Sequence, residues 1–130
     1  MSKILVIDND DLFRQYLTML LQRAGFEVRS LPDGAGVLDI LAAERFDAVV
    51  TDLFMPEVDG IEVVINTRRR FPRLPVIGVT GARSDGVDNP CIEAMIRLGA
   101  VGVLRKPIDQ HELLTILNQV LENRPACGQG

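Results

Sequence analysis

The sequence predicts an α/β domain in which five parallel strands form one sheet and five helices cover its two faces. Short apolar runs alternate five times with stretches in which apolar residues recur every three or four positions, the spacing of one helix face. The runs are rich in valine and isoleucine and mostly lack polar alternation, which is typical of parallel strands buried on both faces. The predicted strands are 3–7, 26–30, 48–51, 75–79 and 101–104.

The first two predicted helices follow the first and second strands. In the first, Phe13, Leu17 and Leu20 recur at helical spacing, and Gly25 ends the helix. We expect Asp11 to cap its start. The second helix is predicted over about 33–44.

The last three predicted helices carry clearer start signals. The third begins at Asp59, with Glu62 three residues later, and the fifth begins at Asp109, with Glu112 three residues later. Both are capping-box patterns. The fourth begins at Pro90, since proline favours the first helical position.

Five strand–helix units with right-handed crossovers leave few possible topologies. The common small one is the flavodoxin-like, doubly wound sheet with strand order 2-1-3-4-5. A chain of 130 residues suits a single domain. We expect that domain to span 1–122, with 123–130 forming a flexible tail or the start of a linker.

Composition excludes several classes of protein. The net charge of −4 argues against a nucleic-acid binder. No apolar run is long enough to span a membrane, and the start of the chain lacks a signal-peptide pattern, so we expect a cytoplasmic protein. The spacing of Cys91 and Cys127 fits neither a disulfide framework nor a zinc site.

Polar residues follow four of the five predicted strands. Asp8 and Asn9 follow the first, Asp52 the third, Thr80 the fourth and Lys106 the fifth. In the predicted order these four strands are neighbours, and doubly wound sheets bind ligands at the carboxyl ends of their strands. We therefore expect these side chains to converge on one patch.

The residue types in this patch indicate phosphoryl transfer. Carboxylates packed together persist when a cation lies between them, and few oxygen ligands suit magnesium. A hydroxyl and a lysine suit the oxygens of a phosphoryl group. Asp52 would be the nucleophile and would form an acyl phosphate.

Four motifs in register then resemble those of response-regulator receiver domains, of the chemotaxis-regulator type, which act in two-component signal transduction. They are Val-Ile-Asp-Asn-Asp at 6–10, Val-Val-Thr-Asp-Leu-Phe-Met-Pro at 49–56, Val-Thr-Gly at 79–81 and Leu-Arg-Lys-Pro at 104–107. The resemblance covers about 3–122. It implies a phosphoacceptor signalling domain that catalyses only its own phosphorylation and dephosphorylation, rather than an enzyme acting on a separate substrate.

The resemblance also assigns a role to each site residue. Asp52 would accept a phosphoryl group from a sensor histidine kinase or a phosphotransfer protein. The Mg²⁺ ligands would be Asp8, Asn9, Asp52 and the backbone carbonyl of Phe54. Thr80 would hydrogen-bond a phosphoryl oxygen.

On the same resemblance, Lys106 would pair with the phosphoryl charge, and the Lys106-Pro107 peptide would be cis. Gly60 would occupy a turn that needs positive φ. The downstream effector is not identified by the sequence. Receiver domains often pair through their fourth and fifth helices and the strand between them, which makes a homodimer of this kind one expectation.

Four residues depart from the family's pattern. Asn9 replaces a second acidic residue, so we expect weaker magnesium affinity. Val103 replaces an aromatic residue that moves with the threonine on phosphorylation. Phe54 and Ala82 replace polar residues that orient the hydrolytic water, so we expect slow loss of the phosphoryl group.

The sequence also allows two other functions. A degenerate receiver would dock a protein partner regardless of phosphorylation, and Asn9 and Val103 favour it. A phosphatase of the haloacid-dehalogenase type would use Asp8 as its nucleophile, because Asp8-Asn9-Asp10 matches an Asp-x-Asp motif. The aspartate that becomes phosphorylated, Asp52 or Asp8, distinguishes this phosphatase from a receiver.

Overall fold

The computed structural model describes residues 2–53, 60–81 and 90–122, which form a five-stranded parallel sheet and five helices. The strands lie in the order β2-β1-β3-β4-β5, so the flavodoxin-like fold class and the strand order predicted from the sequence are confirmed. The elements in chain order are β1 (Lys3–Ile7), α1 (Asp11–Arg23), β2 (Glu27–Leu31), α2 (Val37–Ala43), β3 (Ala48–Asp52), α3 (Gly60–Arg70), β4 (Val76–Thr80), α4 (Pro90–Leu98), β5 (Gly102–Arg105) and α5 (Gln110–Glu122).

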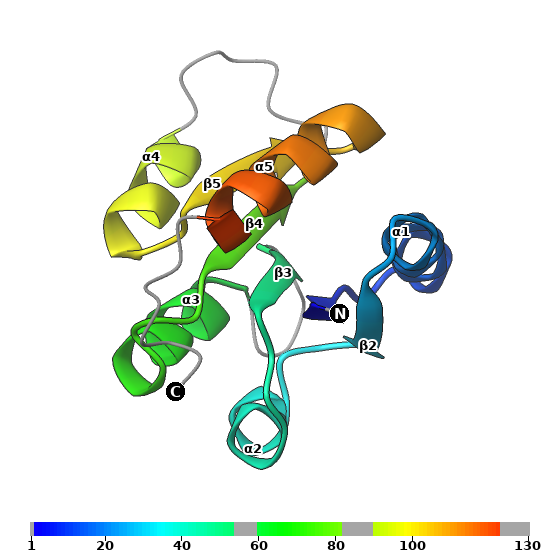
Figure 1. The fold of residues 1–130 in the computed structure, drawn as a ribbon. Helices are drawn as coiled ribbons and strands as arrows, with labels where there is room; N and C mark the ends of the chain where they lie inside the picture. Colours follow the sequence, from blue (N-terminus) through cyan, green and yellow to red (C-terminus); the bar gives the residue numbers. More distant parts are fainter. Residues whose placement is uncertain (1, 54–59, 82–89, 123–130) are drawn as a thin grey trace.

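The helices cover the sheet as two layers, α1 and α5 on one side and α2, α3 and α4 on the other (Figure 1). Successive strand residues enter opposite layers, because side chains alternate across a strand. In β1, Ile4 packs in the cluster that contains Leu17 of α1, whereas Leu5 packs in the cluster that contains Leu41 of α2. The inner strands are therefore buried on both faces, as their unbroken apolar runs predict.

The edge strand β2 differs from the inner strands. Its residues are exposed or half-buried, whereas all five residues of β3 are buried. The apolar run predicted at 26–30 is displaced by one residue, to Glu27–Leu31. An edge strand packs on one neighbour only, so its sequence carries a weaker apolar signal.

The predicted start of the second helix is wrong. Helix α2 begins at Val37, four residues later than predicted. The Asp33 carboxylate accepts a hydrogen bond from the Ala35 amide at 2.8 Å, which forms a turn and not a helix cap. Gly36 then adopts φ 79°, a left-handed conformation that separates this turn from the helix.

The start signals of the last two helices are confirmed. Pro90 is the first residue of α4, and Asp109 caps α5 by accepting hydrogen bonds from the amides of His111 and Glu112 at 2.8 and 3.4 Å. Asp59 and the predicted tail lie outside the described residues. In the part of the chain that is described, no helix combines the length and apolar character needed to cross a membrane.

Candidate functional site

Strand register brings the predicted site residues to one edge of the sheet. Ile7 of β1 is opposite Thr51 of β3, and Asp52 is opposite Val79 of β4. Thr80 is opposite Arg105 of β5, and its carbonyl accepts a hydrogen bond from the Lys106 amide at 2.8 Å. Asp8, Asp52, Thr80 and Lys106 therefore end four adjacent strands or follow them directly, as the strand order requires.

Asp8 is almost completely buried, with 1% of its surface exposed. Its Oδ1 accepts a hydrogen bond from the Asp10 amide at 2.8 Å. Its Oδ2 has no hydrogen-bond donor among the described residues. A buried carboxylate oxygen without a hydrogen-bond donor is unfavourable, because only nearby charge then offsets its desolvation. This oxygen is the polar atom of the site that a bound cation would satisfy.

Lys106 provides the nearest positive charge to that oxygen. Its Nζ lies 3.1 Å from Asp8 Oδ2, without the geometry of a hydrogen bond, and 3.8 Å from Asp52 Oδ2. The Lys106 ammonium also lies 4.3 Å from the centre of the Phe13 ring, a cation–π contact. Lys106 therefore lies between two buried carboxylates, with an aromatic face as its third contact.

The residues around Asp52 are also buried. The exposed fractions of Asp52 and Thr80 are 5% and 3%. Gly60 is the first residue of α3, and its amide donates to the Leu53 carbonyl at 3.1 Å. A Cβ at Gly60 would overlap the Asp52 carbonyl oxygen. The positive φ expected at Gly60 is wrong; glycine is required because α3 begins against the backbone of Asp52.

The start of α1 holds the first strand's loop in place. Asp10, and not Asp11, is the N-cap, because its Oδ1 accepts from the amides of Leu12 and Phe13 at 3.1 and 3.2 Å. Arg14 donates to the Asp8 carbonyl at 2.8 Å and pairs with Asp11 at 2.7 Å. These contacts leave the Asp8 side chain directed toward Lys106.

The oxygen donors suit a small hard cation. Asp8 and Asp52 supply two carboxylates, and Asn9 lies exposed beside Asp8. Across residues 2–53, 60–81 and 90–122, no three histidine, cysteine or acidic side chains are grouped for a metal. Magnesium binds through one or two carboxylates and keeps several waters, so this sparse set fits it. The Phe54 carbonyl lies outside the described residues.

Three further predictions concern the Lys106-Pro107 peptide, Val103 and Ala82. The Lys106-Pro107 peptide is cis, which confirms the expectation. Val103 is half-buried, pairs with Gly78 and packs in the cluster beneath α2, α3 and α4. Ala82 and the rest of the loop to residue 89 lie outside the described part of the chain.

The sequence did not predict the parts played by Phe13 and Arg14. Phe13 was assigned to the core face of the first helix, which it does join, but its ring also contacts Lys106. Arg14 carries no motif. Its spacing of six residues from Asp8, about one turn into the helix that follows the strand, is the only available signal.

Comparison with known proteins defines the class. The family model of the response regulator receiver domain matches residues 4–118. The chain belongs to this family.

Individual proteins similar to this chain support its membership of the family. Response regulator MprA of Mycolicibacterium vanbaalenii is 35% identical over 129 residues, 98% of this chain and 54% of that protein. Full-length FixJ from B. japonicum superposes with a TM-score of 0.85 at 31% identity, covering 98% of this chain and 61% of that one. Vibrio cholerae chemotaxis protein CheY4 gives 0.82 at 31% identity, covering 93% and 99%. The chain spans about half the length of the curated relatives it matches.

Proposed function

We propose that this receiver domain accepts a phosphoryl group on Asp52, with Mg²⁺ bound beside it, and acts as a switch in a two-component pathway. The observation that carries the proposal is the position of Lys106 Nζ, 3.1 Å from Asp8 and 3.8 Å from Asp52. A half-buried lysine between two buried carboxylates, one with an unsatisfied oxygen, suits a site that binds a cation and a phosphoryl group.

The proposed metal ligands are Asp8, Asn9, Asp52 and the carbonyl of Phe54. When bound, the cation would neutralise charge on the carboxylates and on the incoming phosphoryl oxygens. The Asp10 amide donates a hydrogen bond to the Asp8 carboxylate, and the Arg14 guanidinium donates one to the Asp8 carbonyl, so both groups of Asp8 are fixed in position. The protein's own contribution is therefore a preset arrangement that needs little reorganisation.

The transfer step uses three side chains. An oxygen of the Asp52 carboxylate attacks phosphorus, forming an O–P bond as the bond between phosphorus and the donor breaks. The donor is a phosphohistidine of a kinase or phosphotransfer protein, whose imidazole takes up a proton from water and leaves as neutral histidine. Lys106 pairs with the transferred group, and the Thr80 hydroxyl donates to one of its oxygens.

The test is the intact mass of the protein after incubation with acetyl phosphate, with and without MgCl₂. We expect the wild type to gain one phosphoryl group when magnesium is present. The Asp52→Asn variant should gain none. Peptide mapping then locates the group. A phosphoryl group on Asp8 instead would support the phosphatase alternative.

Asn9 favours one competing function, a receiver that docks its partner without phosphorylation, because it removes a charge from the metal site. No mass gain at any magnesium concentration, restored by Asn9→Asp, would support this docking module. A gain in the wild type rejects it.

We also propose that a second copy of the chain is a partner. The described end of α4 and the residues after it expose Ile96, Leu98 and Val101 at 51%, 41% and 51%. This apolar surface adjoins β5 and suits a homodimer through α4, β5 and α5 after phosphorylation. Sedimentation of the wild type and of Val101→Asp, with and without the phosphoryl mimic beryllofluoride, tests this homodimer. Only the wild type with beryllofluoride should dimerise.

A further inference from the structure

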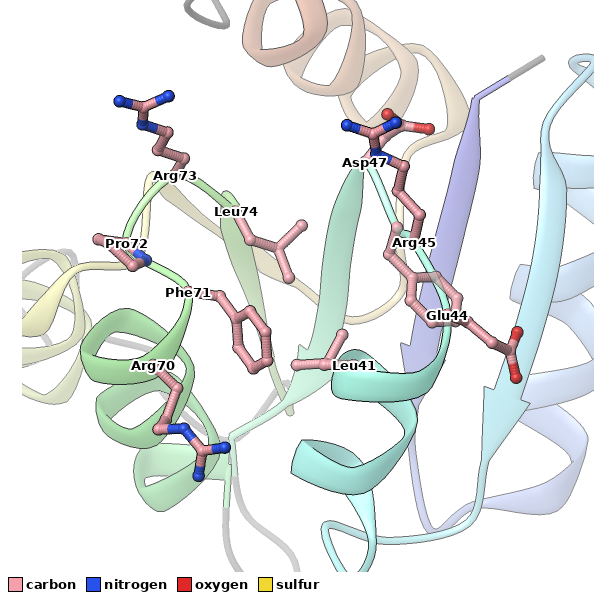
Figure 2. A pocket seen from close by; sticks show the side chains of 10 residues that line it. Leu41, Glu44, Arg45, Asp47, Arg70, Phe71, Pro72, Arg73 and Leu74 are labelled. Atoms are coloured by element: carbon pink, nitrogen blue, oxygen red, sulfur yellow. The ribbon is translucent and has the colours of Figure 1, made fainter. Parts of the chain in front are cut away.

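A hollow of about 420 Å³ lies at the amino-terminal edge of the sheet, opposite the candidate phosphorylation site. It is bordered by the end of α2, by the residues before β3 and by the turn before β4. Figure 2 shows the side chains of Leu41, Phe71 and Leu74 gathered toward its centre. The volume falls within the range of small-molecule sites, about 300–1,000 Å³.

The floor of the hollow is apolar and well supported. Leu41 and Phe46 are 6% and 7% exposed and belong to the buried cluster under α2, α3 and α4. Phe71 and Leu74 are half-buried and pack against that cluster. These side chains already have their positions fixed by the core, so an apolar ligand would gain contact area without ordering a loop.

The rim of the hollow is positively charged. Arg45, Arg70 and Arg73 border it, and Figure 2 shows their guanidinium groups spread around its edge. All three side chains are exposed, so their charges lie at the rim in contact with water. Planar guanidinium groups bind carboxylate and phosphate in a bidentate manner.

The two acidic residues of the rim are already engaged. Glu44 accepts from Lys3 Nζ at 2.6 Å and also contacts Arg29. The Asp47 carboxylate accepts from the Lys3 amide at 2.7 Å. Lys3 and Arg29 offset the charge of Glu44, so the three arginines of the rim outnumber its other carboxylate, Asp47, and the surroundings favour an anion.

We propose that this hollow binds a small organic anion with an aromatic or branched apolar body and one carboxylate or phosphate group. The apolar part would lie on Leu41, Phe71 and Leu74, and the anionic group would meet the arginine rim. The site is separate from the proposed phosphoacceptor, because it lies before β3 and β4 whereas Asp52 and Thr80 end those strands.

The test is a titration of the full, isotope-labelled chain with 2-naphthoate, followed by amide chemical shifts. Its matched neutral probe is 2-naphthamide, which has the same body without the charge. We expect saturable shifts at 41–47 and 70–74 and about fivefold weaker binding of the amide, since the amide lacks the charge that the exposed arginine rim meets.

Variants locate the charge effect. Arg70→Gln with Arg73→Gln should weaken the binding of 2-naphthoate toward that of the amide, because only Arg45 of the rim remains, and should leave the binding of the amide unchanged. Arg69→Gln is the matched control, because Arg69 is exposed on the same helix and does not border the hollow, so it should bind 2-naphthoate as the wild type does.

Three outcomes overturn the proposal. The first is no saturable shift at 41–47 and 70–74, or shifts elsewhere only. The second is that 2-naphthoate and 2-naphthamide bind the wild type equally well and that the double variant binds both with the same affinity as the wild type. The third is movement of these signals with protein concentration and not with 2-naphthoate, which would mean that a second copy of the chain occupies the hollow.

Discussion

Lys3 and Lys106 are the only lysines in the chain, and they lie at opposite edges of the sheet in closely similar surroundings. Their side chains are 22% and 21% exposed. Lys3 Nζ lies 4.9 Å from the centre of the Phe46 ring and Lys106 Nζ lies 4.3 Å from that of Phe13. Each ammonium also has two carboxylates within 4 Å.

The two sites differ in the exposure of the carboxylates around each lysine. Lys3 contacts Glu44 at 2.6 Å and Glu27 at 3.8 Å, and these side chains are 26% and 58% exposed. The corresponding partners of Lys106 are Asp8 and Asp52, with side chains 1% and 7% exposed. Water can solvate the first pair of acids and reaches the second pair poorly.

Hydrogen bonding separates the two edges further. The hydrogen bond from Lys3 is the main cause that lowers the pKa of Glu44; desolvation opposes it, and the charges of Arg29 and Lys3 lower the pKa further. At the other edge, Asp8 Oδ2 has no donor in the described part of the chain. One edge is a satisfied ion cluster, and the other holds a buried charge that is incompletely compensated. The same residue types thus serve stability at one edge and are available for binding at the other.

The largest expected effect comes from exchanging each lysine for methionine. Lys106→Met should slow phosphorylation by acetyl phosphate about 100-fold, because it removes the charge that meets the transferred group. Lys3→Met should leave the rate unchanged, since Lys3 lies at the far edge. Initial rates from intact mass measure both, and a similar loss in the two variants would contradict the comparison.

Asn9→Asp should sharpen the contrast by adding a third carboxylate to the edge that already has two. We expect the magnesium concentration for half-maximal phosphorylation to fall about tenfold, because ligand charge sets the affinity of such sites. Asp39→Asn, an exposed charge change on α2, is the control and should leave it unchanged. An unaltered magnesium dependence in Asn9→Asp would show that position 9 does not contact the metal.

Phe13→Leu removes the aromatic face under Lys106 and keeps an apolar side chain of the core. Phosphorylation should slow about threefold, in line with a partly exposed cation–π contact. Phe46→Leu makes the same change beneath Lys3 and should leave the rate at its wild-type value. Should the double variant Phe13→Leu with Lys106→Met be slower than Lys106→Met alone, the ring would act by some route other than the lysine.

The smallest effect concerns stability at the Lys3 edge. The lowered pKa of Glu44 means that its ionised form stabilises the fold above the unfolded value near 4.5, and that this contribution is lost as pH falls through the folded pKa. Wild type should therefore be more stable than Glu44→Gln at neutral pH, and the difference should vanish in acid. Urea denaturation across this pH range measures it. A difference that persists when Glu44 is protonated would assign it to packing.

Much of the fold followed from the sequence because the inner strands are buried on both faces. That burial requires unbroken apolar runs, and five such runs joined by right-handed crossovers leave few strand orders, of which 2-1-3-4-5 is the common one. The start of α2 did not follow, because the Asp33 side chain has two uses, as a cap or as a turn, and the following glycines favour the turn. The choice between Asp10 and Asp11 as the cap of α1 was ambiguous for the same reason.

The site was predicted as a set of residue types at strand ends, and the structure brings Asp8, Asp52 and Lys106 together. What sequence reasoning lacked was the surroundings. Nothing in the pattern distinguishes a lysine between exposed glutamates from one between buried aspartates, and helical periodicity assigns Phe13 to the core without its contact to Lys106. Burial and orientation depend on the packed layers, which a linear pattern does not encode.

The most direct test of this contrast is the effect of MgCl₂, at matched ionic strength, on the free energy of unfolding of wild type, Asp8→Asn and Glu44→Gln. Magnesium that binds only the folded state should stabilise wild type and Glu44→Gln by the same amount. It should leave Asp8→Asn unchanged, because that variant lacks the unsatisfied carboxylate oxygen. Equal stabilisation of Asp8→Asn and wild type would contradict the claim that this edge of the sheet is the cation site.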